Sequence, residues 1–379
     1  MSGKTPGLVY GTEGSWAEGE LGESSMQQET RWRLHDCRMQ KRRAALLGTV
    51  SVLFLIVTLS LAGCRTTPRE TATTPVERVA VRLKWLHQAQ FAGFYCAKEL
   101  GFYRQKGLDV ALEPGGAPDP TSPLPSPAIQ MVSSGSEDFG VAGADQILLA
   151  RDKGIPLVAV AVIYRKSPVC YFALKRSGIR RPQDFVGKRV AVRLGGNEEV
   201  TYRAMMKKAG VDTRKVAEVP VKYDMTPLFT GRVMAWPGYS INEPIVAQEE
   251  GYEVNLIWPS DYGVSLYADT LFTTEKMIKD KPDVVKRFVA ATLEGWAYAI
   301  DHQEEAVKFT LKQSDTLKEA HERTMMKASV ELLKPDDKPI GWMDASKWHE
   351  LQDLLLEAGF LKSRQDVTNA FTTQFLDGT

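Results

Sequence analysis

Cysteine and histidine, the residues of disulfide and metal chemistry, are scarce in this sequence. It contains four cysteines and five histidines among 379 residues. Four cysteines are too few for a disulfide framework. Only Cys96 and Cys170 lie in the region that is typical of a folded domain, so at most one internal bridge is possible, and we expect two separate buried thiols. The histidines of that region lack metal-ligand spacing and are expected to be surface or core residues. They are His87, His302, His321 and His349.

A dominant charge and a catalytic signature are also missing. Lysine and arginine number 48 against 47 acidic residues, a net charge of +1, and no basic stripe supports nucleic-acid binding. The sequence has no Gly-x-Ser-x-Gly elbow, no phosphate-binding Walker loop and no His-Glu-x-x-His helix. The content of 43% hydrophobic and 25% charged residues is ordinary for a globular protein, and the length allows two domains. We therefore expect no nucleic-acid partner, no catalytic residue, no metal and no cofactor.

Near the N-terminus, the uncharged run Ala44–Gly63 follows a basic cluster at Met39–Arg43. A basic segment, an apolar run and small residues before a cleavage point are typical of a secretory signal. The ending Leu-Ala-Gly-Cys resembles a bacterial lipobox, which implies cleavage before Cys64 and lipidation of its thiol. A membrane span is the alternative, since about 20 apolar residues cross a bilayer. We predict a signal peptide at residues 39–63 and a lipid anchor on the extracytoplasmic side of a bacterial membrane. Residues 1–38 are expected to be a misassigned start or a disordered leader.

The rest of the chain begins with a Thr- and Pro-rich tether, residues 64–77, and then alternates between strand and helix patterns. A strand at Val81–Leu86, a helix and a strand at Leu108–Leu112 predict an opening βαβ unit. A second α/β series follows, with a strand expected at Val233–Trp236, and from Leu271 onward the pattern predicts helices. Two α/β series followed by helices indicate two lobes that the chain crosses more than once.

Aromatic turns at strand ends are the first candidates for a ligand site, because ligands of open α/β sheets bind outside the carboxyl ends of the strands. Trp85 lies at the end of the first predicted strand, and with Phe91 and Tyr95 it is expected to clamp a flat ring by stacking. Core packing is the alternative for these three side chains. Tyr262 adds an aromatic residue in a later turn.

Two polar turns complete the candidate site. One precedes a helix and is expected to offer backbone N–H groups to an acceptor, unless it is an ordinary turn between strand and helix. The other places a carboxylate beside an amide, which suits the polar edge of a ligand. The first turn is Gly195, Gly196 and Asn197, and the second contains Tyr239, Asn242 and Glu243.

Several segments, in this order along the chain, resemble one family of transport proteins. They include WLHQAQFAGFYCAKELGFYRQKGLDV, GVAGADQ, SGIRRPQDFVGKRVAV, AWPGYSINEP and DYGVSLYADTLFTTEKMI. Together they resemble the thiamine-precursor and riboflavin-type solute-binding proteins of ABC importers. These proteins are similar in turn to the pyrimidine synthase of fungal thiamine biosynthesis. The similarity covers nearly all of the chain from Val81 to about Leu333.

The resemblance implies an α/β fold of the type II periplasmic-binding-protein kind, with two lobes, a hinge and a ligand cleft between the lobes. Residues 78–163 with 266–379 would form one lobe, and residues 164–265 the other. By the same likeness, Trp85 matches a tryptophan that lines the pyrimidine site. Glu243 matches an acidic residue that binds the amino edge of the pyrimidine.

Three positions depart from the family's patterns. Where the synthase has the lysine that binds pyridoxal phosphate, this chain has Ala142, and its histidine four residues later is replaced by Gln146. Without these groups the synthase's covalent chemistry is not available. Lys84 stands where the pyrimidine binders often have a small acid or amide, which leaves room for a flavin or another heterocycle.

The function that the resemblance implies is capture of a small heteroaromatic nutrient by a monomeric, lipid-anchored substrate-binding protein. The ligand would be a thiamine pyrimidine precursor or a riboflavin-like compound, and the partners would be the permease and ATPase of an ABC importer. A binding protein for a sulfonate or nitrate would have the same fold and is a rival interpretation. A sensory ectodomain and a synthase-like enzyme are two more, and we do not expect an enzyme.

Overall fold

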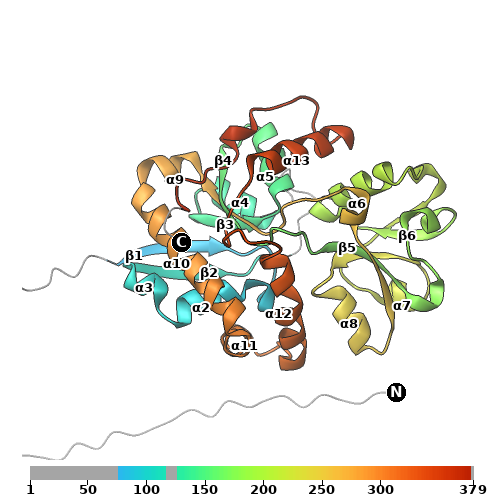
Figure 1. Cartoon of the computed structure of the whole chain (residues 1–379), viewed down its shortest axis with the longest axis horizontal. Helices are drawn as coiled ribbons and strands as arrows, with labels where there is room; N and C mark the ends of the chain where they lie inside the picture. The colour runs from blue at the N-terminus through green and yellow to red at the C-terminus, as the bar shows by residue number, and fades with distance from the viewer. Residues whose placement is uncertain (1–75, 117–125, 377–379) are drawn as a thin grey trace, which may run out of the picture. The chain divides into compact units, whose positions relative to one another are not determined.

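The computed structural model describes residues 76–116 and 126–376 (Figure 1). Its larger sheet begins with β1 (Glu77–Arg82), which pairs in parallel with β2 (Leu108–Glu113). The helices α2 (Ala92–Glu99) and α3 (Phe102–Gln105) lie between these strands in the chain, so the predicted βαβ unit is confirmed. The first strand ends at Arg82 and not at Leu86. Beyond it, single hydrogen bonds continue, as from the Leu83 N–H to the Glu113 carbonyl oxygen at 2.8 Å.

The larger sheet has five strands in the order β2-β1-β3-β10-β4. The other members are β3 (Phe139–Ala142), β4 (Leu157–Val162) and β10 (Thr270–Thr274), and β10 is antiparallel to both neighbours. The prediction that the chain is helical from Leu271 onward was wrong at this point. The segment is rich in threonine, and its first four residues are buried, which suits a central strand better than a helix.

Two smaller sheets come from the middle of the chain. In the first, β5 (Val169–Leu174) pairs antiparallel with β8 (Trp236–Tyr239) and β9 (Val254–Ile257). In the second, β6 (Arg189–Val192) pairs parallel with β7 (Ala217–Pro220). The strand predicted at Val233–Trp236 is observed at Trp236–Tyr239 instead, and the observed strand contains Pro237. Proline is tolerated there because β8 is an edge strand.

Helices cover the sheets in two groups (Figure 1). We call the five-stranded sheet with its helices the large lobe, and the two smaller sheets with theirs the small lobe. The large lobe contains α4 (Pro127–Ser133), α5 (Ala144–Asp152), α9 (Glu275–Asp280), α10 (Pro282–Asp301), α11 (Gln303–Leu311) and α12 (Glu319–Leu333). The small lobe contains α6 (Asn197–Lys208), α7 (Thr226–Phe229) and α8 (Glu243–Glu249).

Helix α2, which comes after β1 in the chain, packs closely against α10. This packing depends on two glycines: a Cβ on Gly93 would lie 2.1 Å from Cδ2 of Trp296, and one on Gly295 would lie 2.3 Å from the carbonyl oxygen of Gly93. Neither distance is sterically possible, so a side chain at either position would push the helices apart.

The chain crosses between the lobes along two neighbouring segments that are hydrogen bonded to each other. The Ile163 N–H donates to the Asp269 carbonyl oxygen at 2.8 Å, and the Ala268 N–H donates to the Tyr164 carbonyl oxygen at 3.1 Å. A C-terminal helix, α13 (Ala345–Glu357), contacts α5 of the large lobe and α6 of the small lobe. The fold is thus a two-lobed α/β fold with a paired hinge, as expected.

The predicted leader, signal peptide and lipidated Cys64 lie outside the described residues, and β1 begins at Glu77, the last residue assigned to the tether. Across 76–116 and 126–376, none of the helices combines the length with the apolar character that a membrane span requires. Cys96 and Cys170 are both buried and unbridged, which confirms the expectation of two separate thiols.

Candidate functional site

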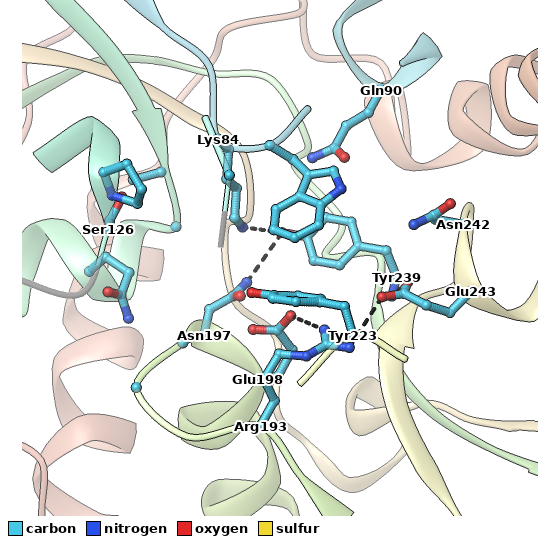
Figure 2. Close-up of a pocket in the computed structure, with 18 of the residues that line it drawn as sticks. Lys84, Gln90, Ser126, Arg193, Asn197, Glu198, Tyr223, Tyr239, Asn242 and Glu243 are labelled. Atoms are coloured by element: carbon cyan, nitrogen blue, oxygen red, sulfur yellow. Dashed lines mark hydrogen bonds and ion pairs between the residues drawn. The ribbon is translucent and has the colours of Figure 1, made fainter. Parts of the chain in front are cut away.

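The carboxyl ends of strands from both lobes meet at one cavity. Lys84 and Trp85 follow β1, Ala142 ends β3, Arg193 follows β6 and Tyr239 ends β8. The space between the lining atoms is about 670 Å³, part of it open to solvent, a size that suits a small organic ligand. We call it the aromatic cavity (Figure 2).

Trp85 is held at this cavity by the chain that returns beside it. The Gly115 N–H donates to the Trp85 carbonyl oxygen at 2.8 Å. A Cβ at Gly115 would lie 2.3 Å from the carbonyl oxygen of Leu83, so only glycine allows this close approach. The backbone that carries the indole is therefore fixed beside the segment that follows β2.

The ring opposite Trp85 is Tyr223, which belongs to the small lobe and lies between β7 and α7. The two ring centroids are 4.4 Å apart and the ring planes are inclined at 46°. Cζ of Arg193 lies 4.3 Å from the centroid of the Tyr223 ring, a cation–π contact. Aromatic side chains from both lobes thus meet within one cavity.

Arg193 is neutralised by two carboxylates (Figure 2). Its guanidinium lies 2.7 Å from Oε1 of Glu198 and 3.4 Å from Oε1 of Glu243, and only 5% of the residue is exposed. Burial alone would raise the pKa of Glu198, but Arg193 and Lys84 hold that pKa below its ordinary value. Glu243 also accepts the Tyr239 N–H at 2.8 Å.

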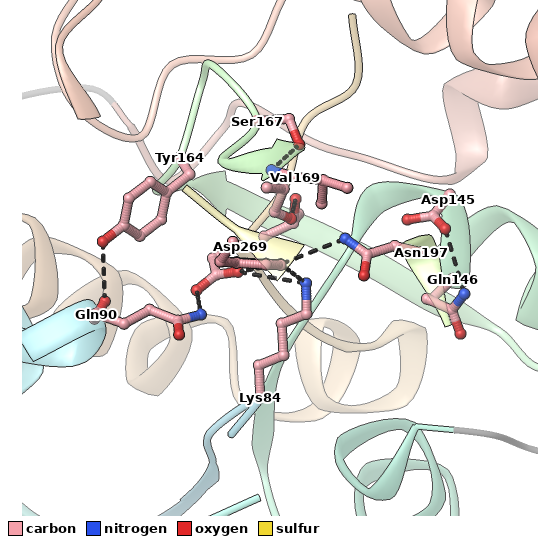
Figure 3. A network of polar contacts seen from close by, with 12 residues as sticks. Lys84, Gln90, Asp145, Gln146, Tyr164, Ser167, Val169, Asn197 and Asp269 are labelled. Carbon is pink, nitrogen blue, oxygen red and sulfur yellow. Dashed lines mark hydrogen bonds and ion pairs between the residues drawn. The ribbon is translucent and has the colours of Figure 1, made fainter. Parts of the chain in front are cut away.

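Lys84 is the second cation of the cavity lining, and it is also paired (Figure 3). Its Nζ donates to the Tyr239 hydroxyl and lies 3.5 Å from Oδ1 of Asp269. Asp269 further accepts from Nε2 of Gln90 at 2.6 Å, and Asn197 donates to the Tyr239 hydroxyl at 3.3 Å. Burial raises the pKa of Asp269, while Lys84 opposes that rise. Both cations in the lining therefore have carboxylate partners inside the protein.

The structure brings seven of the predicted ligand residues to the aromatic cavity. They are Trp85, Gly195, Gly196, Asn197, Tyr239, Asn242 and Glu243. The Gly195 N–H donates to Oε2 of Glu199 at 2.9 Å, so this donor serves the helix that it precedes.

Three predicted residues lie elsewhere. Phe91 and Tyr95 are fully buried in the core. Phe91 belongs to the one-turn helix η1 (Ala89–Phe91), which packs on α11 and α12, and Tyr95 belongs to α2, which packs on α10 and α11. The Tyr95 hydroxyl contacts Nδ1 of His87 at 3.0 Å. Tyr262 ends η5 (Pro259–Tyr262), which packs on α6, and it is not part of the cavity lining.

Other lining residues were not among the predicted ligand residues. Ala142 and Gln146 were singled out only as departures from the synthase pattern, and both line the cavity. Gln88, Gln90, Gly116, Ser126, Pro127, Gly143, Arg193, Glu198 and Tyr223 complete the additional lining with Lys84. The sequence pattern predicts a strand at Arg189–Arg193, so Arg193 was detectable as a residue at a strand end, whereas Tyr223 lies in a loop without a motif.

Two further observations bear on the chemistry of the site. His321 of α12 reaches across to the small lobe, where Nδ1 lies 3.0 Å from Oε1 of Glu249 and Nε2 lies 3.2 Å from Oδ1 of Asn242. In the part of the chain that the structure describes, no group of three or more His, Cys, Asp or Glu side chains is arranged to hold a metal ion.

A family model described as "NMT1/THI5 like" matches residues 88–306, more than half of the chain. The chain belongs to this family. The match contains α2, both hinge segments and most of the cavity lining.

The curated proteins that are similar to this sequence include binding proteins and enzymes. The riboflavin-binding protein RibY of Chloroflexus aurantiacus is 24% identical over 357 residues, covering 90% of this chain and 99% of the relative. The formylaminopyrimidine-binding protein of Halalkalibacterium halodurans is 27% identical over 329 residues, covering 85% and 97%. The 4-amino-5-hydroxymethyl-2-methylpyrimidine phosphate synthase of Legionella pneumophila is 25% identical over 312 residues, covering 80% and 93%.

Solved structures agree with the fold of this family member. The periplasmic aliphatic sulphonate binding protein SsuA of Escherichia coli superposes with a TM-score of 0.61 at 17% identity, covering 78% of this chain and 92% of that protein. At this identity the likeness concerns the fold alone, which is the periplasmic-binding-protein fold.

Proposed function

We propose that this chain is the substrate-binding protein of an ABC importer and that it captures a small heteroaromatic nutrient in the aromatic cavity. The ligand is a thiamine pyrimidine precursor or a riboflavin-like compound, and the protein delivers it to a permease driven by an ATPase. The observation that carries the proposal is the meeting of Trp85 and Tyr223 from different lobes at one cavity whose cations are already paired. Flat π systems stack favourably in such a setting.

Binding works by closure of the two lobes around the ligand. We assign residues 78–163 and 266–379 to one lobe and residues 164–265 to the other, with the paired hinge between them. A ligand that contacts both lobes stabilises the closed form by its greater affinity for that form. Trp85 stacks on the ring, and Asn242 and Glu243 bind its polar edge.

An anionic ligand such as a sulfonate or nitrate is also compatible with the fold, but the charges of the cavity argue against it. Arg193 has Glu198 and Glu243 as partners, and Lys84 has Asp269. Binding an anion would therefore require one of these buried pairs to break. A neutral heterocycle with N–H and C=O groups avoids that cost.

Catalysis is a rival to binding, because some relatives carry the names of synthases. Ala142 and Gln146 line the cavity where the resemblance places a lysine and a histidine in the synthase. An alanine methyl group forms no imine, and a glutamine amide does not transfer protons near neutral pH. We therefore assign binding and not chemistry to this site.

Lipidation of Cys64 and an extracytoplasmic location are parts of the same proposal.

The proposal is tested by mass spectrometry of any small molecule that co-purifies with the protein and by calorimetric titration with the pyrimidine and with riboflavin. Trp85→Ala combined with Glu243→Ala should abolish binding while circular dichroism and thermal melting still show a folded protein. The matched control combines Trp342→Ala with Glu253→Ala, two residues outside the aromatic cavity, and should bind normally. Unchanged affinity in the first double variant would rule out this site.

A further inference from the structure

A second cavity adjoins the aromatic cavity. The two share Gln146, Gly195 and Gly196 as lining residues, and the space in the second is about 540 Å³, part of it open to solvent. Its remaining wall is mainly apolar, formed by Ile129, Leu149, Ala150, Val200 and Phe360. The wall also contains two charged side chains, and neither places an unpaired buried charge in the cavity. Glu199 accepts the Gly195 N–H and pairs with Arg203, and Lys153 is exposed.

The residues that both cavities share are two glycines and one glutamine. Gly195 has a φ of 80°, which favours glycine, and a Cβ on Gly196 would come within 2.6 Å of Oε2 of Glu198. No larger side chain therefore fits at either glycine without rearrangement. The third member, Gln146, has a flexible side chain, and its Nε2 donates to Oδ2 of Asp145 at 3.2 Å, the upper end of the usual hydrogen-bond range. Of the three shared residues, Gln146 is the one whose side chain can adopt another rotamer.

Building on the proposed function, we infer that the ligand is a fused-ring heteroaromatic compound, larger than a single pyrimidine. Its polar ring binds in the aromatic cavity beside Trp85, and its apolar edge passes Gln146 into the second cavity against Leu149. The flavin ring system has this chemistry, since a pyrimidine-like ring with polar atoms lies at one end and a dimethylbenzene ring at the other. A lone pyrimidine leaves the second cavity without a ligand group, and the apolar wall then contributes nothing to affinity.

The test compares three ligands, riboflavin, lumichrome and 4-amino-5-hydroxymethyl-2-methylpyrimidine, on the unaltered full chain and on three variants of it. Lumichrome carries a fused ring without the sugar-alcohol chain, so it isolates the contribution of the ring. Leu149→Trp fills the second cavity, and Leu149→Gln makes its wall polar at similar volume. Leu149→Met is the matched control, because this exchange keeps an apolar side chain of similar size. Calorimetry and flavin fluorescence quenching measure affinity, and circular dichroism confirms folding.

We expect the unaltered chain to bind both fused-ring compounds at least about tenfold more tightly than the pyrimidine. Leu149→Trp and Leu149→Gln should each weaken fused-ring binding by about tenfold or more and change pyrimidine binding less than about twofold, whereas Leu149→Met should change neither. If Leu149→Trp fails to fold, Leu149→Gln decides. Preference for the pyrimidine, or fused-ring binding that ignores both variants, overturns this inference and leaves the proposed function standing. Binding of none of the three compounds overturns both.

Discussion

Trp85 and Tyr223 lie with their ring centroids 4.4 Å apart although they belong to different lobes. A flat ring held between two aromatic side chains needs about 7 Å between them, twice the usual contact distance. The two rings are therefore in contact with each other, and a ligand can stack between them only after the lobes have moved apart. This pair makes the cavity sensitive to lobe motion.

Replacing Trp85 tests the stacking contact directly. Trp85→Ala should weaken ligand binding by about 5- to 150-fold, because stacking of a base on an aromatic side chain contributes roughly 1–3 kcal/mol. Trp85→Phe should lose less, since it keeps a ring. Calorimetric titration measures both variants. Equal affinity of Trp85→Ala and the unaltered chain would show that the ligand does not stack on the indole.

The pairing of Arg193 predicts a change of specificity. Glu198→Gln combined with Glu243→Gln removes both negative charges that the guanidinium contacts. The buried cation should then accept methanesulfonate, which the unaltered chain should not bind, and the protein should lose about 3 kcal/mol of unfolding free energy because the charge is left without a partner. Calorimetry and urea unfolding measure the two effects. Glu253→Gln, a change at an exposed carboxylate, is the control. Tight binding of the sulfonate by the unaltered chain would contradict the prediction.

The sequence was sufficient to predict much of this fold, because strand periodicity and family motifs both depend on local order along the chain. Trp85 could be assigned to the site because it lies at the end of the first predicted strand. The cavity partner Tyr223 could not, since its loop has no periodicity and only the packing of the two lobes brings it to Trp85. Phe91 illustrates the opposite case. It is aromatic and close to the strand end, but the direction in which a one-turn helix points its side chains is decided by α11 and α12. The strand β10 was missed because its partners are far away in the sequence.

His321 is predicted to strengthen ligand binding without touching the ligand. It belongs to the large lobe, and its two ring nitrogens contact Glu249 and Asn242 of the small lobe. His321→Ala removes both contacts between the lobes and should weaken binding by about 3- to 30-fold, because each hydrogen bond contributes on the order of 1 kcal/mol. His302→Ala is a matched control, since His302 is exposed and its Nδ1 contacts Tyr298, a residue of the adjoining helix α10. Equal losses in the two histidine variants would contradict a role for His321 in closure.

The buried carboxyl of Asp145 is predicted to make stability depend on pH. Only 1% of this residue is exposed, and its Oδ1 has no hydrogen-bond partner in the described part of the chain. Burial raises the pKa of Asp145, and Lys84 opposes that rise. A carboxyl whose pKa is higher in the folded state binds more protons there. Its contribution to stability is therefore complete below the unfolded value of about 3.9 and is lost as the pH rises through the folded value.

Asp145→Asn removes this titration while keeping an acceptor oxygen. Urea unfolding between about pH 4 and pH 8 should show that the unaltered chain loses more unfolding free energy with rising pH than the variant does. Other buried acids, such as Asp269, titrate in both proteins, so the difference between the two curves isolates Asp145. Asp152→Asn, at the exposed end of the same helix, should follow the unaltered chain. Parallel curves for the unaltered chain and Asp145→Asn would mean that this carboxyl has the same pKa in the folded and unfolded states.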